Sequence, residues 1–230
     1  MADRPYTLLS CSVSLDGYLD SATDERLLLS NDADFDRVDA VRASCDAILV
    51  GAATVRNDNP RLLVRAGGRR SERVARGLPP SPIKVTVTCS TNLDTYANFF
   101  ATGDSQKLVY CASETVRKAR DRLGSAATVV DGGQPVSMER MSEDLYARGV
   151  KRLMVEGGGM VHTQFLTADL ADELHLVVAP IFVGDSRAPR FVGDGRFPWN
   201  PDRRATLAEV CPIGDVVLLR YALSPRFRMD

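Results

Sequence analysis

The stretch Val155-Glu156-Gly157-Gly158-Gly159-Met160 guides the interpretation of the whole chain. It follows a short, mostly apolar run and precedes residues with apolar side chains at helical spacing. The glycines therefore stand at a predicted strand-to-helix junction, where glycine permits positive φ and close approach by another molecule. The N–H groups and dipole of a helix start favour an anion such as a phosphate. We expect either a phosphate-bearing cofactor here, with chemistry beside Glu156, or a tight turn without a ligand.

The bulk composition is that of a soluble globular protein. The chain has 230 residues, of which 44% are hydrophobic and 26% charged, and this length suggests one or two domains. A net charge of −1 argues against a nucleic-acid partner. No run approaches the roughly 18 apolar residues of a membrane span, and the N-terminus lacks the basic-then-apolar pattern of a signal peptide. We therefore expect a cytoplasmic protein without nucleic-acid or membrane partners.

Cysteines and histidines give no metal-site pattern. The five cysteines form no C-x-x-C pair, and their odd number argues against a disulfide framework or a structural zinc site. They are Cys11, Cys45, Cys89, Cys111 and Cys211. The only two histidines, His162 and His175, lie in a predicted helix and a predicted strand. We expect both to be structural and expect no metal site.

Residues 47–168 alternate between predicted strands and helices. This pattern is typical of a largely parallel sheet with helices on its faces, and ligands of such sheets gather at the carboxyl ends of the strands. Small or polar residues follow five predicted strands. They are Ser14–Asp16, Gly51–Thr54, Ser90–Thr91, Cys111–Ser113 and Glu156–Gly159. Two further strands, at 205–210 and 216–221, predict an antiparallel hairpin at one edge of the sheet.

Arginines are concentrated between two predicted strands. From Arg61 to Arg76 there are six arginines and one carboxylate, Glu72. We expect residues 61–80 to form a mobile, solvated connection, since a long loop of this kind is either functional or disordered. Arg61 and Arg65 flank a more ordered-looking Asn-Pro turn, and arginine can hold a phosphate with its two-pronged guanidinium. They are candidates for a phosphate site; otherwise they are surface charges.

Several short motifs together resemble one family. They are Ser14-Leu15-Asp16-Gly17, Asp46 to Ala52 with Thr54, Asp58-Asn59-Pro60-Arg61-Leu62 with Arg65, Glu156-Gly157-Gly158, and Asp172-Glu173-Leu174. In this order and spacing they resemble the pyrimidine reductase of riboflavin biosynthesis, which has the dihydrofolate-reductase-like fold. The resemblance spans nearly the whole chain and implies an α/β fold in a single domain, residues 1–230.

The resemblance implies NADPH-dependent reduction of 5-amino-6-(5-phosphoribosylamino)uracil to its ribityl form. The hydride would reach C1′ of the ribose as an open-chain imine, with the cofactor carrying the chemistry and the protein orienting and protonating. Bifunctional members carry a zinc deaminase domain, whose H-x-E…P-C-x-x-C signature is missing here, so a stand-alone reductase is expected. The resemblance also suggests a homodimer.

The resemblance further implies a role for each matching residue. The expected cofactor-binding residues are Gly51, Thr54, Asp58, Ser90, Thr91, Gly157, Gly158, Gly159 and Met160. The expected substrate-binding residues are Ser30, Arg61, Leu62 and Arg65, with the arginines on the substrate phosphate. Glu156 and Asp16 are the candidate proton donors, since a carboxyl group in a partly dry cleft can have a raised pKa. Asp16 can instead be a turn residue that binds backbone groups of its own loop.

One position departs from the family pattern. After Asp-Gly the family has Lys or Arg, whereas this chain has Tyr18. A reductase of the same fold acting on a pterin or another small heterocycle therefore stays open. So does a catalytically silent NADPH-binding protein. A third alternative, an NAD-linked Rossmann dehydrogenase, is disfavoured because this chain lacks the G-x-G-x-x-G motif that such enzymes have after the first strand.

Overall fold

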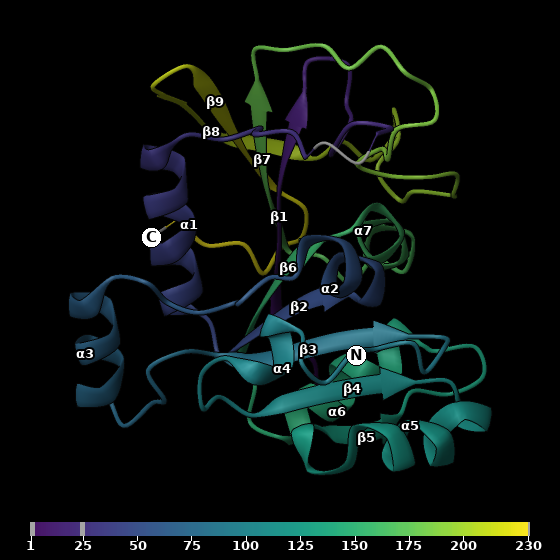
Figure 1. The fold of residues 1–230 in the computed structure, drawn as a ribbon. Helices are drawn as coiled ribbons and strands as arrows, with labels where there is room; N and C mark the ends of the chain where they lie inside the picture. Colours follow the sequence, from purple (N-terminus) through teal and green to yellow (C-terminus); the bar gives the residue numbers. More distant parts are fainter. Residues whose placement is uncertain (1–2, 24–25, 230) are drawn as a thin grey trace. The chain divides into compact units, whose positions relative to one another are not determined.

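The computed structural model describes residues 3–23 and 26–229. The chain divides into two compact units. One comprises Met1–Pro5 with Asp39–Met154, and the other comprises Tyr6–Val38 with Val155–Asp230. Of the three boundaries, one falls between Pro5 and Tyr6, one inside the helix α1 (Asp32–Ser44) and one inside the strand β6 (Arg152–Gly157). Figure 1 labels the elements along the chain.

The first unit is built on parallel strands. The strands are β2 (Ala47–Gly51), β3 (Ile83–Thr88), β4 (Lys107–Cys111) and β5 (Thr128–Asp131), and their order is β5-β4-β3-β2-β6. Neighbouring strands from β2 to β5 pair in parallel. All five residues of β2 are buried, as expected of a parallel strand covered on both faces. The helices of this unit are α2 (Ala52–Asp58), α3 (Gly67–Ala75), α4 (Asn98–Ala101), α5 (Val116–Leu123) and α6 (Met138–Ala147).

Strand β3 buries polar as well as apolar side chains. Its alternating sequence predicts a strand, yet Lys84 and Thr86 on the polar side are as buried as the apolar Val85. The Lys84 ammonium donates to the carbonyl oxygens of Phe99, at 3.1 Å, and Thr102, at 2.6 Å. Burial lowers the pKa of Lys84 to about 8. Strand β3 is therefore buried on both faces despite its alternating sequence, and backbone carbonyl oxygens satisfy the Lys84 ammonium.

The second unit continues the parallel pattern and then reverses it. Strand β1 (Tyr6–Ser14) pairs in parallel with β7 (Glu173–Ala179), from Leu8 opposite Glu173 to Ser14 opposite Ala179. Strands β8 (Thr206–Ile213) and β9 (Val216–Ala222) form an antiparallel hairpin, and β9 pairs antiparallel with β7. The order in this unit is β6-β1-β7-β9-β8. These registers confirm the predicted α/β fold with a mostly parallel sheet and a C-terminal hairpin.

Helix α1 begins at an asparagine cap and is tied to β7. The Asn31 side chain accepts a hydrogen bond from the Asp34 N–H at 3.0 Å, which satisfies a free donor of the first turn. Arg37 contacts Nδ1 of His175 at 3.1 Å, and Nε2 of His175 contacts Glu173 at 2.7 Å. Burial lowers the pKa of His175. These contacts give His175 the structural role that was expected.

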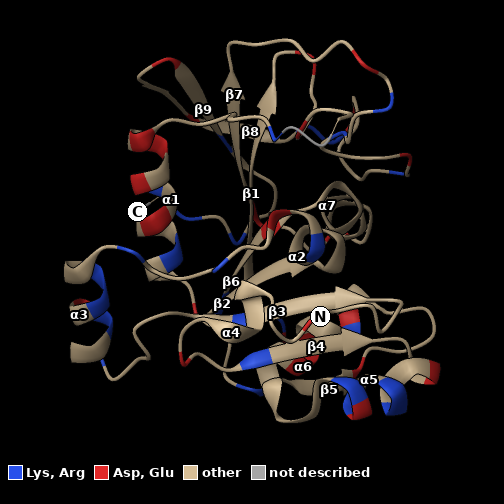
Figure 2. Ribbon diagram, in the orientation of Figure 1, with Lys and Arg blue, Asp and Glu red and all other residues tan. Residues whose placement is uncertain are grey.

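The expectation of a mobile connection at residues 61–80 is wrong. Residues 67–75 form α3, and Figure 2 shows its basic residues along the helix. The reason is Arg73, which is only 3% exposed. Its guanidinium donates to the carbonyl oxygens of Pro79, Ala43 and Cys45 at 2.7–2.8 Å.

Candidate active site

The three glycines form a bend between β6 and α7 (Gly159–Thr167), as predicted. Gly157 has φ +135°, a backbone conformation that side chains rarely permit, and the Gly157–Gly158 peptide bond is cis. Gly158 is the N-cap of α7 with an extended backbone. We call Gly157–Gly159 the glycine bend.

Part of the need for glycine comes from the protein itself. A Cβ on Gly159 would lie 2.3 Å from the carbonyl oxygen of Arg190, which is much closer than atoms can approach. A Cβ on Gly157 would lie 3.7 Å from Nε2 of His162, an ordinary contact. Gly159 therefore lacks a side chain because a second segment of the same unit packs on it.

The start of α7 nonetheless leaves donors available. The N–H groups of Val161 and His162 both reach the Gly158 carbonyl, at 2.9 and 3.1 Å. In the described parts of the chain, nothing accepts a hydrogen bond from the N–H of Gly159 or Met160. Met160 also exposes 76% of its surface. Free N–H groups at a helix start are suited to bind a phosphate.

His162 lies under the glycine bend. It is fully buried, and neither ring nitrogen has a hydrogen-bond partner among the described residues. Its ring lies 5.4 Å from that of Phe191 at an angle of 55°. Burial lowers the pKa of His162 to about 4, so the ring is neutral at pH 7.

Asp16 is held by its own loop and the segment after β7. The Ser14 hydroxyl donates to its carboxylate at 2.6 Å, and the N–H groups of Val183 and Gly184 donate at 3.1 and 2.8 Å. The hydrogen bond from Ser14, supported by the two N–H groups, lowers the pKa of Asp16 to about 2. The raised pKa expected for a proton donor is therefore not found at Asp16, whose carboxylate is ionised near neutral pH.

Glu156 lies near the carboxyl end of β6, directly before the glycine bend. It is half-buried between the buried Val155 and Gly157. Ser30, also half-buried, donates its hydroxyl to Asp34 of α1. The second unit thus contains both candidate carboxylates, the glycine bend and Ser30.

The other predicted cofactor residues lie in the first unit. Gly51 ends β2 and is the N-cap of α2 with φ −69° and ψ 154°, which any residue can adopt. Thr54 and Asp58 are half-buried residues of α2. Thr88, at the end of β3, accepts a hydrogen bond from the Ser90 N–H at 3.1 Å, and Ser90 accepts one from the Asn92 N–H at 3.4 Å. The hydroxyl-rich corner at Ser90 and Thr91 is thus a turn with internal hydrogen bonds.

The predicted substrate residues of the first unit lie between α2 and α3. Arg61 is exposed, whereas Leu62 is 2% exposed and has a positive φ of 49°. The Arg65 N–H donates to Asp39, but its side chain is 60% exposed and its guanidinium Nε is 3.9 Å from that carboxylate. Both guanidinium groups are therefore accessible to a ligand.

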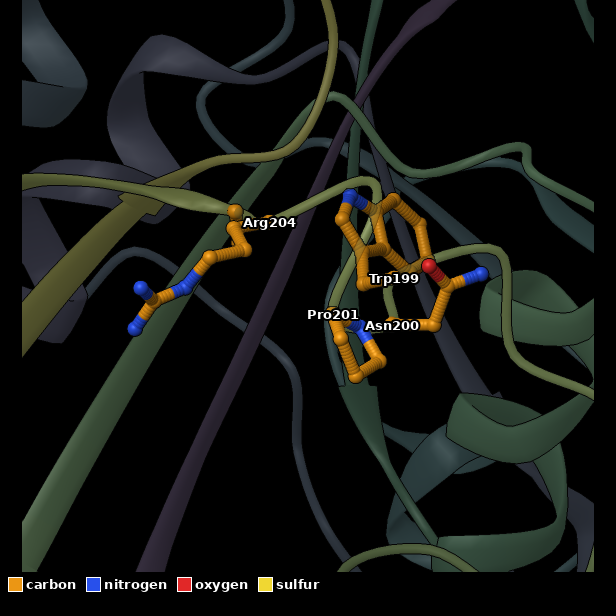
Figure 3. A pocket seen from close by; sticks show the side chains of 5 residues that line it. Trp199, Asn200, Pro201 and Arg204 are labelled. Atoms are coloured by element: carbon orange, nitrogen blue, oxygen red, sulfur yellow. The ribbon is translucent and has the colours of Figure 1, made fainter.

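Sequence reasoning did not find the cavities. One of about 490 Å³ in the second unit is lined by Trp199, Asn200, Pro201, Arg204 and Ala205. In Figure 3 the Arg204 side chain extends away from Trp199. Another, of about 540 Å³ in the first unit, is lined by residues of α5 and by Ser113 and Asp131. Sequence reasoning also missed the hydrogen bond that Arg190 donates to the Tyr18 hydroxyl at 2.9 Å.

Comparisons with known proteins identify the family. The sequence model of the RibD C-terminal domain matches residues 5–219. The chain is 33% identical, over 81% of its length and 85% of the relative's, to the 2,5-diamino-6-ribosylamino-4(3H)-pyrimidinone 5′-phosphate reductase of Archaeoglobus fulgidus. No helix among the described residues is both long and apolar enough to cross a bilayer.

Solved structures confirm the fold. A pyrimidine reductase-like protein from Corynebacterium diphtheriae is similar with a TM-score of 0.79, at 22% identity over 95% of this chain and 91% of that one. Dihydrofolate reductase from Enterococcus faecalis, complexed with NADP(H), is similar with a TM-score of 0.50, at 11% identity over 96% and 98% of the two chains. The resemblance inferred from the motifs is confirmed, and the chain belongs to the RibD C-terminal domain family.

Proposed function

We propose that this chain is an NADPH-dependent reductase that converts the ribosyl group of a phosphorylated aminopyrimidine into a ribityl group. The observation that carries the proposal is the glycine bend, with free N–H groups at Gly159 and Met160 and Glu156 directly before it. Its support is membership of a family in which a relative 33% identical to this chain is named as a reductase of a phosphorylated ribosylaminopyrimidinone.

The residues of the bend fit a dinucleotide. The free N–H donors of Gly159 and Met160 at the start of α7 are suited to a diphosphate. In the first unit we propose Gly51, Thr54, Asp58, Ser90 and Thr91 as further cofactor-binding residues. A reduced nicotinamide would supply the hydride, and the protein would hold it in place.

We propose Glu156 as the proton donor and exclude Asp16 from that role. The carboxylate of Asp16 already accepts three hydrogen bonds and has a pKa of about 2, so it has no proton to give near neutral pH. We propose that Asp16 instead holds the loop at the end of β1. Arg61 and Arg65 would bind the substrate phosphate through their accessible guanidinium groups, with Leu62 and Ser30 beside the substrate.

Two pyrimidines are candidate substrates. The sequence motifs suggest 5-amino-6-(5-phosphoribosylamino)uracil, whereas the relative from A. fulgidus is named for the 2,5-diamino-4(3H)-pyrimidinone compound. The two share the phosphorylated ribose and differ at position 2 of the ring, which bears an oxygen in one and an amino group in the other. The reacting carbon is therefore the same in both.

A substrate panel tests the proposal. NADPH oxidation is followed with each pyrimidine and with dihydrofolate, and NADH replaces NADPH in a parallel set. We expect turnover with at least one pyrimidine and NADPH. Turnover with dihydrofolate alone would support a reductase that acts on a pterin. NADPH binding without any turnover would support a catalytically silent binding protein.

We also propose a single functional domain, residues 1–230, acting as a cytoplasmic homodimer. The single domain is supported by two of the three boundaries between the units, which fall within the continuous elements α1 and β6. Sedimentation of the purified chain tests the oligomeric state.

A further inference from the structure

The segment after β7, residues 180–193, is fastened to the loop after β1. We call it the strap. The Leu15 N–H donates to the Ile181 carbonyl at 2.8 Å, and the Leu19 N–H donates to the Pro189 carbonyl at 2.7 Å. The Phe191 N–H donates to the Gly17 carbonyl at 3.2 Å. Backbone contacts near both ends thus fix the course of the strap.

The strap carries two arginines with different partners. Arg187 donates through two nitrogens to Asp185, at 2.7 and 3.1 Å, and its charge is neutralised. Arg190 instead donates to the Tyr18 hydroxyl at 2.9 Å, with its guanidinium carbon 4.6 Å from the centre of the Tyr18 ring. In the described ranges, no carboxylate lies within ion-pair distance of Arg190.

An aromatic ring orients a cation without neutralising it. Contact with the face of a ring stabilises a guanidinium by about 0.5–1 kcal/mol at an exposed site, whereas the charge stays available for an anion. Tyr18 is only 5% exposed, so it provides a fixed platform, and Arg190 is exposed above it. The remaining donors of the planar guanidinium match the geometry of a phosphate.

The same residue packs on the glycine bend. The Arg190 carbonyl oxygen occupies the space where a side chain of Gly159 would lie, at 2.3 Å from that Cβ position. Its neighbour Phe191 lies against His162 of α7. The backbone of Arg190 is thus fixed beside the free N–H groups at the start of α7.

We propose that Arg190, oriented by Tyr18, is an anion-binding residue that takes a phosphate group of the ligand at the glycine bend. This inference rests on the proposed function, because that function brings two phosphate sources to the site. One is the diphosphate of the dinucleotide, and the other is the phosphate of the pyrimidine substrate.

The test compares Arg190→Gln with Arg187→Gln, a matched change on the same strap. The dissociation constants for NADPH and for inorganic pyrophosphate are measured by titration, without turnover. The KM is measured for the phosphorylated pyrimidine and for the same compound without its phosphate. We expect Arg190→Gln to weaken either NADPH or the phosphorylated pyrimidine at least 10-fold, Arg190→Lys to recover part of the loss, and Arg187→Gln to change neither more than 2-fold.

The arms identify the source of the phosphate. A weaker affinity for both NADPH and pyrophosphate assigns Arg190 to the cofactor. A raised KM that disappears with the phosphate-free pyrimidine assigns it to the substrate. If Arg190→Gln matches wild type in every arm, the proposal is overturned.

Two controls separate other causes. Thermal unfolding is recorded for each variant, and if Arg190→Gln unfolds, Tyr18→Phe carries the test. That change keeps the ring and the charge but removes the 2.9 Å hydrogen bond, and we expect a loss of about 3-fold in the same arm; no loss overturns the proposal. If the wild type turns over neither pyrimidine, the proposed function fails; the two titrations then decide alone, and an Arg190→Gln variant that binds NADPH and pyrophosphate like wild type overturns the proposal.

Discussion

Two glycine runs begin helices in this protein, and they differ in why glycine is there. Gly67 and Gly68 begin α3 in the first unit, and neither requires glycine. A Cβ on Gly68 would meet nothing within 4 Å, and one on Gly67 would meet only the end of the Arg70 side chain at 3.8 Å. At the glycine bend, in contrast, Gly157 has a positive φ and Gly159 has no room for a side chain.

The difference separates a permissive glycine from a required one. The sequence places the first run in a predicted mobile connection and the second at a predicted strand-to-helix junction, and only the structure shows whether glycine is required at either. The requirement at Gly159 comes from the strap, so it is not by itself a sign of a ligand. The features that indicate a ligand are the free N–H groups at the start of α7 and the adjacent Glu156, together with the family of the chain.

Gly159→Ala should have the largest effect. Because its Cβ would overlap the Arg190 carbonyl, either the strap or the start of α7 must move. We expect a loss of about 3 kcal/mol in the free energy of unfolding and at least 100-fold weaker NADPH binding. Urea unfolding and a fluorescence titration measure these. A variant as stable as wild type would show that the close packing at the bend is wrong.

Glu156→Gln should reduce turnover at least 100-fold, equal to about 2.7 kcal/mol of activation free energy. NADPH affinity should change less than 3-fold, because the amide keeps the size of the side chain and removes only the transferable proton. The matched control is Glu72→Gln in α3, an exposed carboxylate after the other glycine run, and it should leave turnover unchanged. Equal losses of turnover and affinity would contradict the proton-donor assignment.

The buried His162 should make the protein less stable in acid. Its pKa of about 4 lies below the ordinary value of 6.5, so the unfolded chain takes up a proton first as the pH falls. The contribution of His162 to the free energy of unfolding is therefore fully present above pH 6.5 and is lost toward pH 4. The loss amounts to about 2 kcal/mol between pH 7 and 4.5. His162→Leu should remove the part of the acid sensitivity that comes from His162 and leave the part that comes from His175. Urea unfolding at pH 7 and 4.5 measures it. The same acid sensitivity in His162→Leu would show that the ring is not buried beneath the bend.

Gly68→Ala should have the smallest effect and the opposite sign. Alanine favours a helix over glycine by about 0.5–1 kcal/mol, and the added methyl group meets no neighbour. We expect a slightly higher midpoint of thermal unfolding and unchanged NADPH affinity. A destabilised variant would mean that glycine is required at this run as well.

The fold was largely predictable because its strands are short apolar runs with clear ends. The predicted hairpin strands at 205–210 and 216–221 correspond to β8 and β9. Strands and helices alternate from β2 to α7, as the pattern over residues 47–168 predicts. Helix α3 was missed because its charges suggested a solvated loop. Its order depends on hydrogen bonds from Arg73 to the carbonyl oxygens of Ala43 and Cys45, which lie 30 and 28 positions earlier in the sequence. Local sequence patterns do not encode such contacts.

The site was predictable as a set of strand ends but not in its internal contacts. The glycine bend and its helix are where the sequence places them. The engagement of Asp16 with the N–H groups of Val183 and Gly184 was not predictable, because it depends on the course of an irregular loop. The pairing of Arg190 with Tyr18 has the same origin. The family has Lys or Arg at position 18, whereas this chain has Tyr18 there, with the guanidinium of Arg190 over its ring.

Transfer of deuterium from labelled cofactor tests the central claim most directly. NADPH carrying deuterium at C4 on the transferred face is incubated with the protein and each phosphorylated pyrimidine, and the product is analysed by mass spectrometry. Our account predicts a ribityl product with a single deuterium at C1′, formed by the wild type and at least 100-fold more slowly by Glu156→Gln. A ribityl product without deuterium, or labelled NADPH that stays unoxidised with both pyrimidines, would contradict it.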